Sequence, residues 1–248
     1  MAAETQVLIA VGLVILGLFI GVEINGSYAK LLSDEILPSI RTIVSAFLGA
    51  WAAFSLQNHR NARESLDKKI GALNRAVFAL SRQYSKMRNI DTQIIQPNRD
   101  HPAAFLQMPA THELEKDDIQ IDFDSLSFIL ETSSRSIMEQ VAIADASYRS
   151  ALDALNSRSR LLLSEFQPLV EKNRILPGHV FDEAQMEKIL GIRLYISLKQ
   201  LGEQLIQSTS RALEQIEAAS SRLSEFGKEN LEKDRVIVVR PIEDEHKT

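Results

Sequence analysis

Hydrophobic residues are concentrated at the start of the chain, and a charged, periodic pattern follows them. Residues 5–22 read TQVLIAVGLVILGLFIGV, without a charge, and residues 36–56 read ILPSIRTIVSAFLGAWAAFSL, with one charge. An uninterrupted apolar helix of about 20 residues matches the hydrocarbon core of a bilayer, which is about 30 Å thick. The pattern therefore predicts a two-helix transmembrane hairpin over residues 1–56, with spans at about 5–24 and 36–56.

The first apolar run has an alternative interpretation as a cleaved signal peptide, with SYA at residues 27–29 as a small-x-small cleavage motif. Signal peptides begin with a basic segment and have an apolar run of about 7–15 residues. Here the preceding MAAETQ contains no lysine or arginine, and the apolar run is longer. Both features favour a membrane span.

Small residues recur at a spacing of four in both predicted spans. They are Gly17 and Gly21 in the first span, and Ser45, Gly49 and Ala53 in the second. In lipid, such a face lets two helix backbones approach closely and gain dispersion contacts. Packing within one hairpin and packing between copies both fit the pattern. We expect a homo-oligomer, and any pore would need several chains because two helices enclose nothing.

Two further residues of the second span suit the edges of a bilayer. Arg41 is the one charged residue in the span and lies near its outer end, where a long side chain can reach the headgroups. An alternative is that several copies of Arg41 form a ring at the outer mouth of an oligomer. Trp51 lies about one turn from the inner boundary, so we expect its indole to anchor the helix at the interface.

The charges that flank the spans predict the orientation of the hairpin. The segment after the second span is rich in basic residues: Arg60, Arg63, Lys68, Lys69, Arg75, Arg82, Lys86 and Arg88. The linker between the spans is acidic on balance. The positive-inside rule places the basic side in the cytoplasm. We therefore expect both termini to be cytoplasmic, with a helical domain over residues 57–230 and a charged tail over residues 231–248.

A heptad pattern follows the second span without a break. Hydrophobic residues alternate at spacings of four and three, with Asp91 at one polar position: Leu66, Ile70, Leu73, Val77, Leu80, Tyr84, Met87 and Ile94. This spacing predicts a coiled-coil-like helix that stops before Pro97. Because no proline or glycine separates the span from the start of the pattern, one long helix can contain both. This helix has two possible roles. It can be a rod that transmits movement to the membrane, or it can be one wall of a helical bundle.

Residues 97–134 interrupt the helical pattern with three prolines and many acids. The acidic run ELEKDDIQIDFD lacks the glycine turn and ligand spacing of a calcium loop, so we expect no metal site there. It is interpreted as a solvated connection near the basic helix. The segment DSLSFIL is expected to be a short helix packed on the bundle.

Two more long helices are predicted further along the chain. One begins at Ser133 or Ser134, and the next begins at Asp182, with Gln185 completing a capping box and Gly227 as its stop. The short apolar run VIVV in the tail can dock on the bundle or on a partner. The predicted fold is therefore all-α, with the transmembrane hairpin followed by an antiparallel bundle of about three long helices.

Composition and motifs argue against an enzymatic function and against nucleic-acid binding. The net charge of −5 disfavours nucleic-acid binding, and the absence of cysteine excludes disulfides and thiolate zinc sites. We find no glycine-rich phosphate loop, no H-E-x-x-H and no G-x-S-x-G. We therefore expect no enzymatic activity, no catalytic residue and no cofactor. The lipid bilayer and a cytoplasmic protein are the expected partners.

Three segments carry a resemblance to a known group: FLGAWAAFSLQNHR, ALNRAVFALSRQYSKMRNI and IDFDSLSFIL. Together with the layout they resemble the two-transmembrane inner-membrane effectors of bacterial anti-phage systems, including retron systems. The resemblance implies a location in the bacterial inner membrane and an effector that partners hold silent until it damages the membrane. The alternative is a membrane-anchored coiled-coil adaptor that gathers a cytoplasmic partner.

Overall fold

The computed structural model describes residues 37–115, 119–173 and 183–238, which form helices and connecting segments without a β-strand. For residues 37–41 and 183–184 only the backbone is described. The chain divides into two compact units, Met1–Glu64 and Ser65–Thr248. The all-α prediction is confirmed for the described ranges. The first predicted span and its Gly17 and Gly21 lie outside them.

Helix α3, Leu37–Ile90, contains both the second predicted span and the heptad pattern. Its one proline, Pro38, lies in the first turn, where a missing N–H is tolerated. In the second unit the predicted stripe is confirmed, because Ile70, Leu73, Val77 and Leu80 are all buried. Further α3 residues are buried between the stripe positions: Ala72, Ala76, Ala79, Gln83 and Ile90. This part of α3 is therefore enclosed on most of its circumference.

The end of α3 widens before a proline, and α5 ends in the same way. A π-helical turn, η3 (Asp91–Ile95), is followed by the short 3-10 helix η4 (Gln96–Asn98), and Gln96 N–H donates to the Asp91 carbonyl. Helix α5 (Arg135–Leu161) is followed by the π turn η6 (Leu162–Phe166) and then α6 (Gln167–Lys172). Pro97 and Pro168 each lack an N–H and crowd the preceding turn, which explains the wider turn.

The remaining elements complete the second unit. Helix α4 is Ala104–Gln107, the 3-10 helix η5 is Asp124–Glu131, α7 is Glu183–Leu190, α8 is Ile192–Asn230, and the 3-10 helix η7 is Lys233–Arg235. The expected short helix at DSLSFIL is confirmed as η5, which buries Leu126 and Ile129. Residue 182 of the expected capping box lies outside the described residues. Ser134 is the N-cap of α5, but its side chain caps no backbone N–H.

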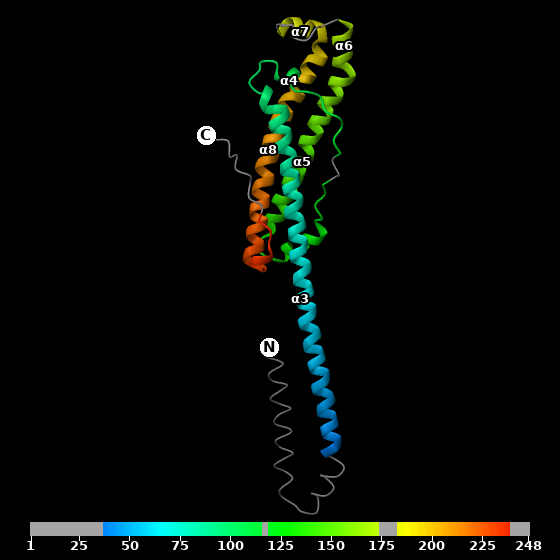
Figure 1. Ribbon diagram of the computed structural model, residues 1–248, viewed down its shortest axis with the longest axis vertical. Coiled ribbons are helices and arrows are strands. Elements are labelled where there is room, and N and C mark those ends of the chain that lie inside the picture. Colours follow the sequence, from blue (N-terminus) through cyan, green and yellow to red (C-terminus); the bar gives the residue numbers. More distant parts are fainter. Residues whose placement is uncertain (1–36, 116–118, 174–182, 239–248) are drawn as a thin grey trace, which may run out of the picture. The chain divides into compact units, whose positions relative to one another are not determined.

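The three long helices of the second unit are not all antiparallel. Figure 1 shows α3 and α5 running in the same direction and α8 running against both. The contacts agree with this arrangement. Lys69 Nζ of α3 lies 5.6 Å from the centroid of the Phe128 ring, just before α5 begins. Further along both helices, Gln83 of α3 is hydrogen-bonded to Asp145 of α5. The prediction of an antiparallel bundle is therefore wrong for the α3–α5 pair. The reason is the connection: residues 108–115 and 119–123, here called the crossover, return along the bundle before α5 begins (Figure 1).

The crossover is also more buried than expected. Met108, Ile119 and Ile121 are part of the main core together with the inner faces of α3, α5 and α8. The interpretation of this segment as a solvated connection is wrong for these three buried positions, although the neighbouring Gln120 and Asp122 are exposed. A smaller core forms the head of the bundle, from Phe105, Leu162, Leu190, Leu194, Tyr195 and Leu198.

Two glycines behave differently from the sequence prediction. Gly191, with φ 75°, breaks the third predicted helix into α7 and α8, since a positive φ suits glycine. Gly227 is not a helix stop, because α8 continues to Asn230. Gly227 is instead buried beneath the tail: a Cβ there would lie 2.8 Å from Val236 Cγ1. The expectation that the tail docks on the bundle is confirmed for Val236, which is buried in the main core.

Candidate functional site

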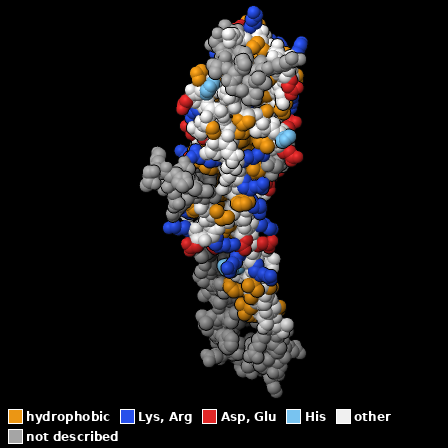
Figure 2. Space-filling model, turned by 45° about the horizontal axis from the view of Figure 1, so that its top comes forward, with side chains coloured by type: hydrophobic (Ala, Val, Ile, Leu, Met, Phe, Trp, Pro, Cys, Tyr) orange, Lys and Arg blue, Asp and Glu red, His pale blue; other side chains and the backbone are white. Residues whose placement is uncertain are grey.

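The residues of α3 from 42 to 56, here called the apolar segment, expose large hydrophobic side chains. Six of them are between 45% and 68% exposed: Ile43, Phe47, Leu48, Trp51, Phe54 and Leu56. Figure 2 shows hydrophobic side chains gathered on the visible face of α3 near its N-terminal end. Full burial of a fully exposed side chain of this size gains about 1.5–3 kcal/mol, and these side chains still have roughly half of that to gain. The apolar segment therefore has the character of a surface that another apolar phase or chain covers.

The predicted packing face lies on this segment. Ser45, Gly49 and Ala53 are all exposed, and their spacing of four places them on one side of α3. Apart from the adjacent backbone of α3, no heavy atom of the described residues lies within 4 Å of a Cβ built at Gly49. The face is thus available for close backbone approach. For Arg41 the structure describes only the helical backbone. The predicted roles of its side chain therefore concern atoms outside the described part of the chain.

Across the described residues, no helix is both long enough and apolar enough to qualify as a membrane span. The first predicted span falls outside these residues, and the side chains at the start of the second predicted span do so as well.

In the second unit, residues 231–238 form a strap, here called the tail strap, across α3 and α8. Asn74 Nδ2 donates to the Arg235 carbonyl at 2.9 Å, and the Ile237 N–H donates to Asn74 Oδ1 at 2.9 Å. The side-chain amide of Asn74 thus pairs with an extended backbone as a neighbouring strand would. Arg235 Nη1 also contacts Asp67 Oδ1 at 2.7 Å, and this hydrogen bond raises the pKa of Arg235.

A second asparagine holds the crossover in the same way. Leu114 N–H donates to Asn156 Oδ1 at 3.0 Å, and Asn156 Nδ2 donates to the Leu114 carbonyl at 2.8 Å. Ser159 Oγ accepts the Thr111 N–H at 3.1 Å. Two residues of one α5 face therefore fix the crossover by its backbone.

Arg158 is the largest fully buried side chain of the described residues, and it lies at the junction of α5 and the head. Its guanidinium donates to the backbone carbonyls of Phe105, Met108 and Pro109, with Nη2 2.9 Å from the Phe105 carbonyl. Burial lowers the pKa of Arg158 to about 10, so the group stays charged at neutral pH. A buried cation that satisfies three carbonyls stabilises the turn before the crossover.

A buried polar contact also joins α3 to α5. Gln83 Nε2 donates to Asp145 Oδ1 at 2.8 Å, and Arg149 Nε donates to Asp145 Oδ2 at 2.8 Å. Gln83 Oε1 is buried without a hydrogen-bond partner among the described residues. Such a polar contact in an apolar seam fixes the register of two helices, because any shift leaves more polar atoms unpaired.

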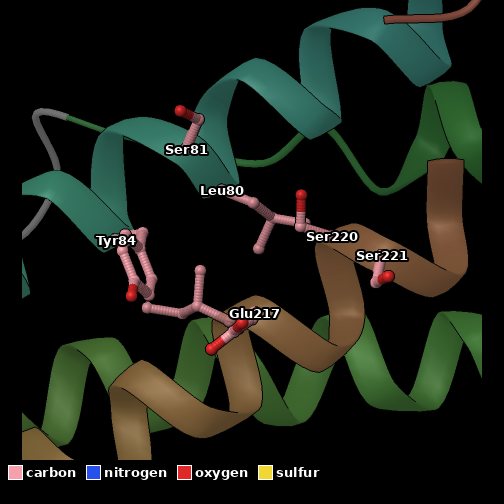
Figure 3. Close-up of a pocket in the computed structure, with 7 residues that line it drawn as sticks. Leu80, Ser81, Tyr84, Glu217, Ser220 and Ser221 are labelled. Atoms are coloured by element: carbon pink, nitrogen blue, oxygen red, sulfur yellow. The ribbon is translucent and has the colours of Figure 1, made fainter. Parts of the chain in front are cut away.

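Figure 3 shows a hollow of the bundle surface that lies between α3 and α8. It has a volume of about 120 Å³ and is lined by Leu80, Ser81, Tyr84, Ile216, Glu217, Ser220 and Ser221. We call this set the seam groove. Its single carboxylate and its hydroxyls do not form a nucleophile–base pair. In the described ranges no group of three or more His, Asp or Glu side chains is placed to hold a metal ion.

Sequence reasoning identified the apolar segment but missed the polar residues that organise the bundle. Asn74, Asn156 and Arg158 had no signal in the heptad analysis, because each is an ordinary surface residue by composition. One clue was available: Arg158 follows Leu155 by three residues and therefore falls on the buried stripe of α5. An arginine on that stripe indicates a specific buried partner.

Comparison of the chain with protein-family models, with curated proteins and with solved structures finds no match in any of the three.

Proposed function

We propose that the protein is a non-enzymatic effector of the bacterial inner membrane. In this proposal the hairpin of residues 1–56 inserts in the bilayer, and the helical bundle binds a cytoplasmic partner and perturbs the membrane when the partner leaves or changes. An anti-phage role follows only from the resemblance of the sequence to retron-type effectors. Both termini are then cytoplasmic.

One observation carries the proposal: the same helix, α3, has two opposite surfaces in succession. Its apolar segment exposes six large hydrophobic side chains, and its later turns bury residues on most sides. Lipid is a suitable environment for the exposed apolar segment. The later turns of α3 are suited to packing against the other helices of the bundle. Helix α3 has no break between Leu37 and Ile90, so both surfaces belong to one continuous helix.

The polar groups of the bundle support a binding role over a catalytic one. Asn74, Asn156 and Arg158 are occupied by backbone groups, and Asp145 is occupied by Gln83 and Arg149. These contacts determine which segments pack together. They suit a bundle with discrete arrangements that a partner can select.

The second candidate function is a membrane-anchored adaptor, and the head of the bundle favours it. Leu163, Ile192 and Ile196 are each more than two-fifths exposed beside the small head core. A head with its own core and exposed apolar residues is a suitable contact for a protein partner. In this reading the hairpin only anchors the bundle.

Inducible expression in a bacterium separates the two candidates. The effector predicts a fall in membrane potential and entry of a membrane-impermeant dye, and the adaptor predicts neither. Replacing the hairpin by unrelated spans abolishes the effect in the first case and preserves partner capture in the second. Recovery of the intact chain in the soluble fraction, or a carboxyl-terminal reporter active outside the cytoplasm, would refute both.

The packing face gives a sharper test of the effector. Gly49→Leu fills a position of the face where no neighbour among the described residues lies within 4 Å of a Cβ, and it should prevent close helix approach. We expect loss of oligomers on cross-linking and at least about tenfold less dye entry. Ala50→Leu adds a similar side chain about 100° around the helix and serves as the matched control. Equal toxicity of the two variants would reject this face as the contact between copies.

A further inference from the structure

A second hollow of the bundle lies between α3 and η5 and is lined by cations. It has a volume of about 380 Å³, and we call it the basic hollow. Its walls include Lys68, Lys69 and Arg75 of α3 and Ser125, Ser127 and Phe128 of η5. All of these residues belong to the second unit. The basic hollow is therefore a concave space where three basic side chains of one helix meet the hydroxyls of another element.

The charge balance of the basic hollow is opposite to that of the whole chain. Three cations line it against a single carboxylate, that of Asp67. Arg235 Nη1 contacts Asp67 Oδ1 at 2.7 Å, so this carboxylate is already neutralised by a cation from the tail strap. The chain as a whole carries a net charge of −5. A concave surface lined by one sign of charge concentrates its potential, and here that potential attracts an anion.

Two of the cations are held in place by their neighbours. Lys69 Nζ lies 5.6 Å from the centroid of the Phe128 ring, which keeps the ammonium group at the η5 wall. Arg75 Nη1 lies 3.5 Å from a Cβ built at Gly71, so the guanidinium folds back along α3 beside the hollow. Arg75 acts electrostatically on Asp122 but forms no ion pair with a described residue. Its donors are therefore available to a ligand.

Hydroxyl groups complete both walls of the basic hollow. Ser65 and Ser127 are exposed, and neither has a hydrogen-bond partner among the described residues. Ser125 is different, because its hydroxyl and its N–H both donate to Asp122. Phosphate oxygens accept hydrogen bonds from ammonium, guanidinium and hydroxyl groups in several directions at once. A phosphate group, with more than one negative charge, therefore suits this set of donors.

We propose that the basic hollow binds a phosphate-bearing anion, with its phosphate oxygens between Lys69 and Arg75. The proposal goes beyond the membrane function and does not depend on it. A bound phosphate would join α3 to η5, the element that directly precedes α5. The phosphate group can belong to a soluble compound or to the headgroup of an anionic lipid, and the chemistry of the site is the same for both.

Equilibrium dialysis of the full chain with radiolabelled inorganic pyrophosphate tests the site. The protein is kept in a neutral detergent, so the measurement requires no insertion into a bilayer. We expect saturable binding of one pyrophosphate per chain, and about tenfold weaker binding for Arg75→Gln and for Lys69→Gln. Arg222→Gln is the matched control, because Arg222 is an exposed arginine of α8 that does not line the hollow. Circular dichroism checks that all variants keep their helices.

A second variant tests the space without changing the charge. Gly71→Leu places a side chain where a Cβ already meets Arg75, so it should fill the hollow and abolish binding. Leucine favours a helix more than glycine does, so loss of folding is not expected. Non-saturable binding, or equal affinities for the wild type, Arg75→Gln and Gly71→Leu, would overturn the proposal.

Lipid added to the same micelles identifies the source of the phosphate. If phosphatidylglycerol lowers the affinity for pyrophosphate and phosphatidylcholine does not, the site accepts an anionic headgroup. If neither lipid changes the affinity, the ligand is a soluble phosphate compound. Both results support the site only when the competition or the binding is lost in Gly71→Leu, and a lipid effect that persists in that variant would count against the basic hollow.

Discussion

The two stretches of α3 on either side of residue 64 have the same secondary structure and opposite surroundings. Before it, Phe47 and Trp51 are about half exposed, and no neighbour fills the space beside Gly49. After it, Leu73, Val77 and Leu80 have no exposed surface. Helix propensity therefore does not distinguish the stretches. Their difference lies in what the rest of the chain provides to cover them.

The covering of the second stretch depends on polar contacts as much as on apolar ones. The crossover lies against the bundle because Asn156, Arg158 and Ser159 bind its backbone or the turn before it. The tail strap is held by Asn74. Single substitutions that remove one contact at a time can therefore be compared with control substitutions on α3 or α5 that leave these contacts in place.

The largest effect is expected for Arg158→Met. This change leaves three backbone carbonyls without their buried donor and should lower the free energy of unfolding by about 3–5 kcal/mol. Arg160→Met is the control on the same helix, because Arg160 is exposed and its ion pair with Glu113 is worth at most about 1 kcal/mol. Urea unfolding followed by fluorescence or proteolysis measures both. Equal destabilisation would mean that the buried cation contributes no more than a surface charge.

Leu80→Ala tests the buried stretch of α3 directly. Leu80 is fully buried in the main core, so removal of three carbons should cost about 2–5 kcal/mol. Leu48→Ala makes the same change in the apolar segment, where the side chain is 49% exposed, and should leave bundle stability unchanged. Thermal unfolding of the second unit, followed by protease sensitivity, compares the two. Similar losses from both variants would show that the two stretches unfold as one body.

These comparisons also show what the sequence could predict. The heptad spacing identified Ile70, Leu73, Val77 and Leu80 as core, because burial on one helix face leaves a periodic signal. It did not predict that α3 and α5 are parallel, since helix direction depends on the path of the connection. That path is fixed by single contacts, such as Asn156 with the backbone of Leu114, which have no periodicity. Gly191 and Gly227 were likewise ambiguous, because glycine suits both a helix end and a close packing contact.

A smaller loss is expected for Asn74→Ala. It removes both Asn74 hydrogen bonds to the tail strap, so the bundle should lose about 1–2 kcal/mol. The strap then keeps its packing, the Arg235–Asp67 contact and the hydrogen bond from Ser224 Oγ to the Ile237 carbonyl. Gln57→Ala is the control in the first stretch, where the side chain only bonds Asn61 one turn away, and it should cost no more than about 0.5 kcal/mol. Hydrogen exchange of the Ile237 amide should accelerate in the first variant and stay unchanged in the second. An unchanged rate in Asn74→Ala would show that Asn74 does not hold the tail.

The smallest effect concerns Asp122, at the end of the crossover beside Arg75 of the buried stretch. The Ser125 hydroxyl and the Ser125 N–H both donate to its carboxylate, and they lower the pKa of Asp122 below its usual value of 3.8. A carboxyl with a lowered folded pKa stabilises the fold above its unfolded pKa, and this contribution is lost as the pH falls through the folded pKa. Ser125→Ala should therefore move the Asp122 pKa upward, which a carboxyl-detected NMR titration measures. Because Asp122 is exposed, stability at neutral pH should change little, and a pKa that stays low would assign the shift to the backbone N–H of residue 125 and to Arg75 instead of the Ser125 hydroxyl.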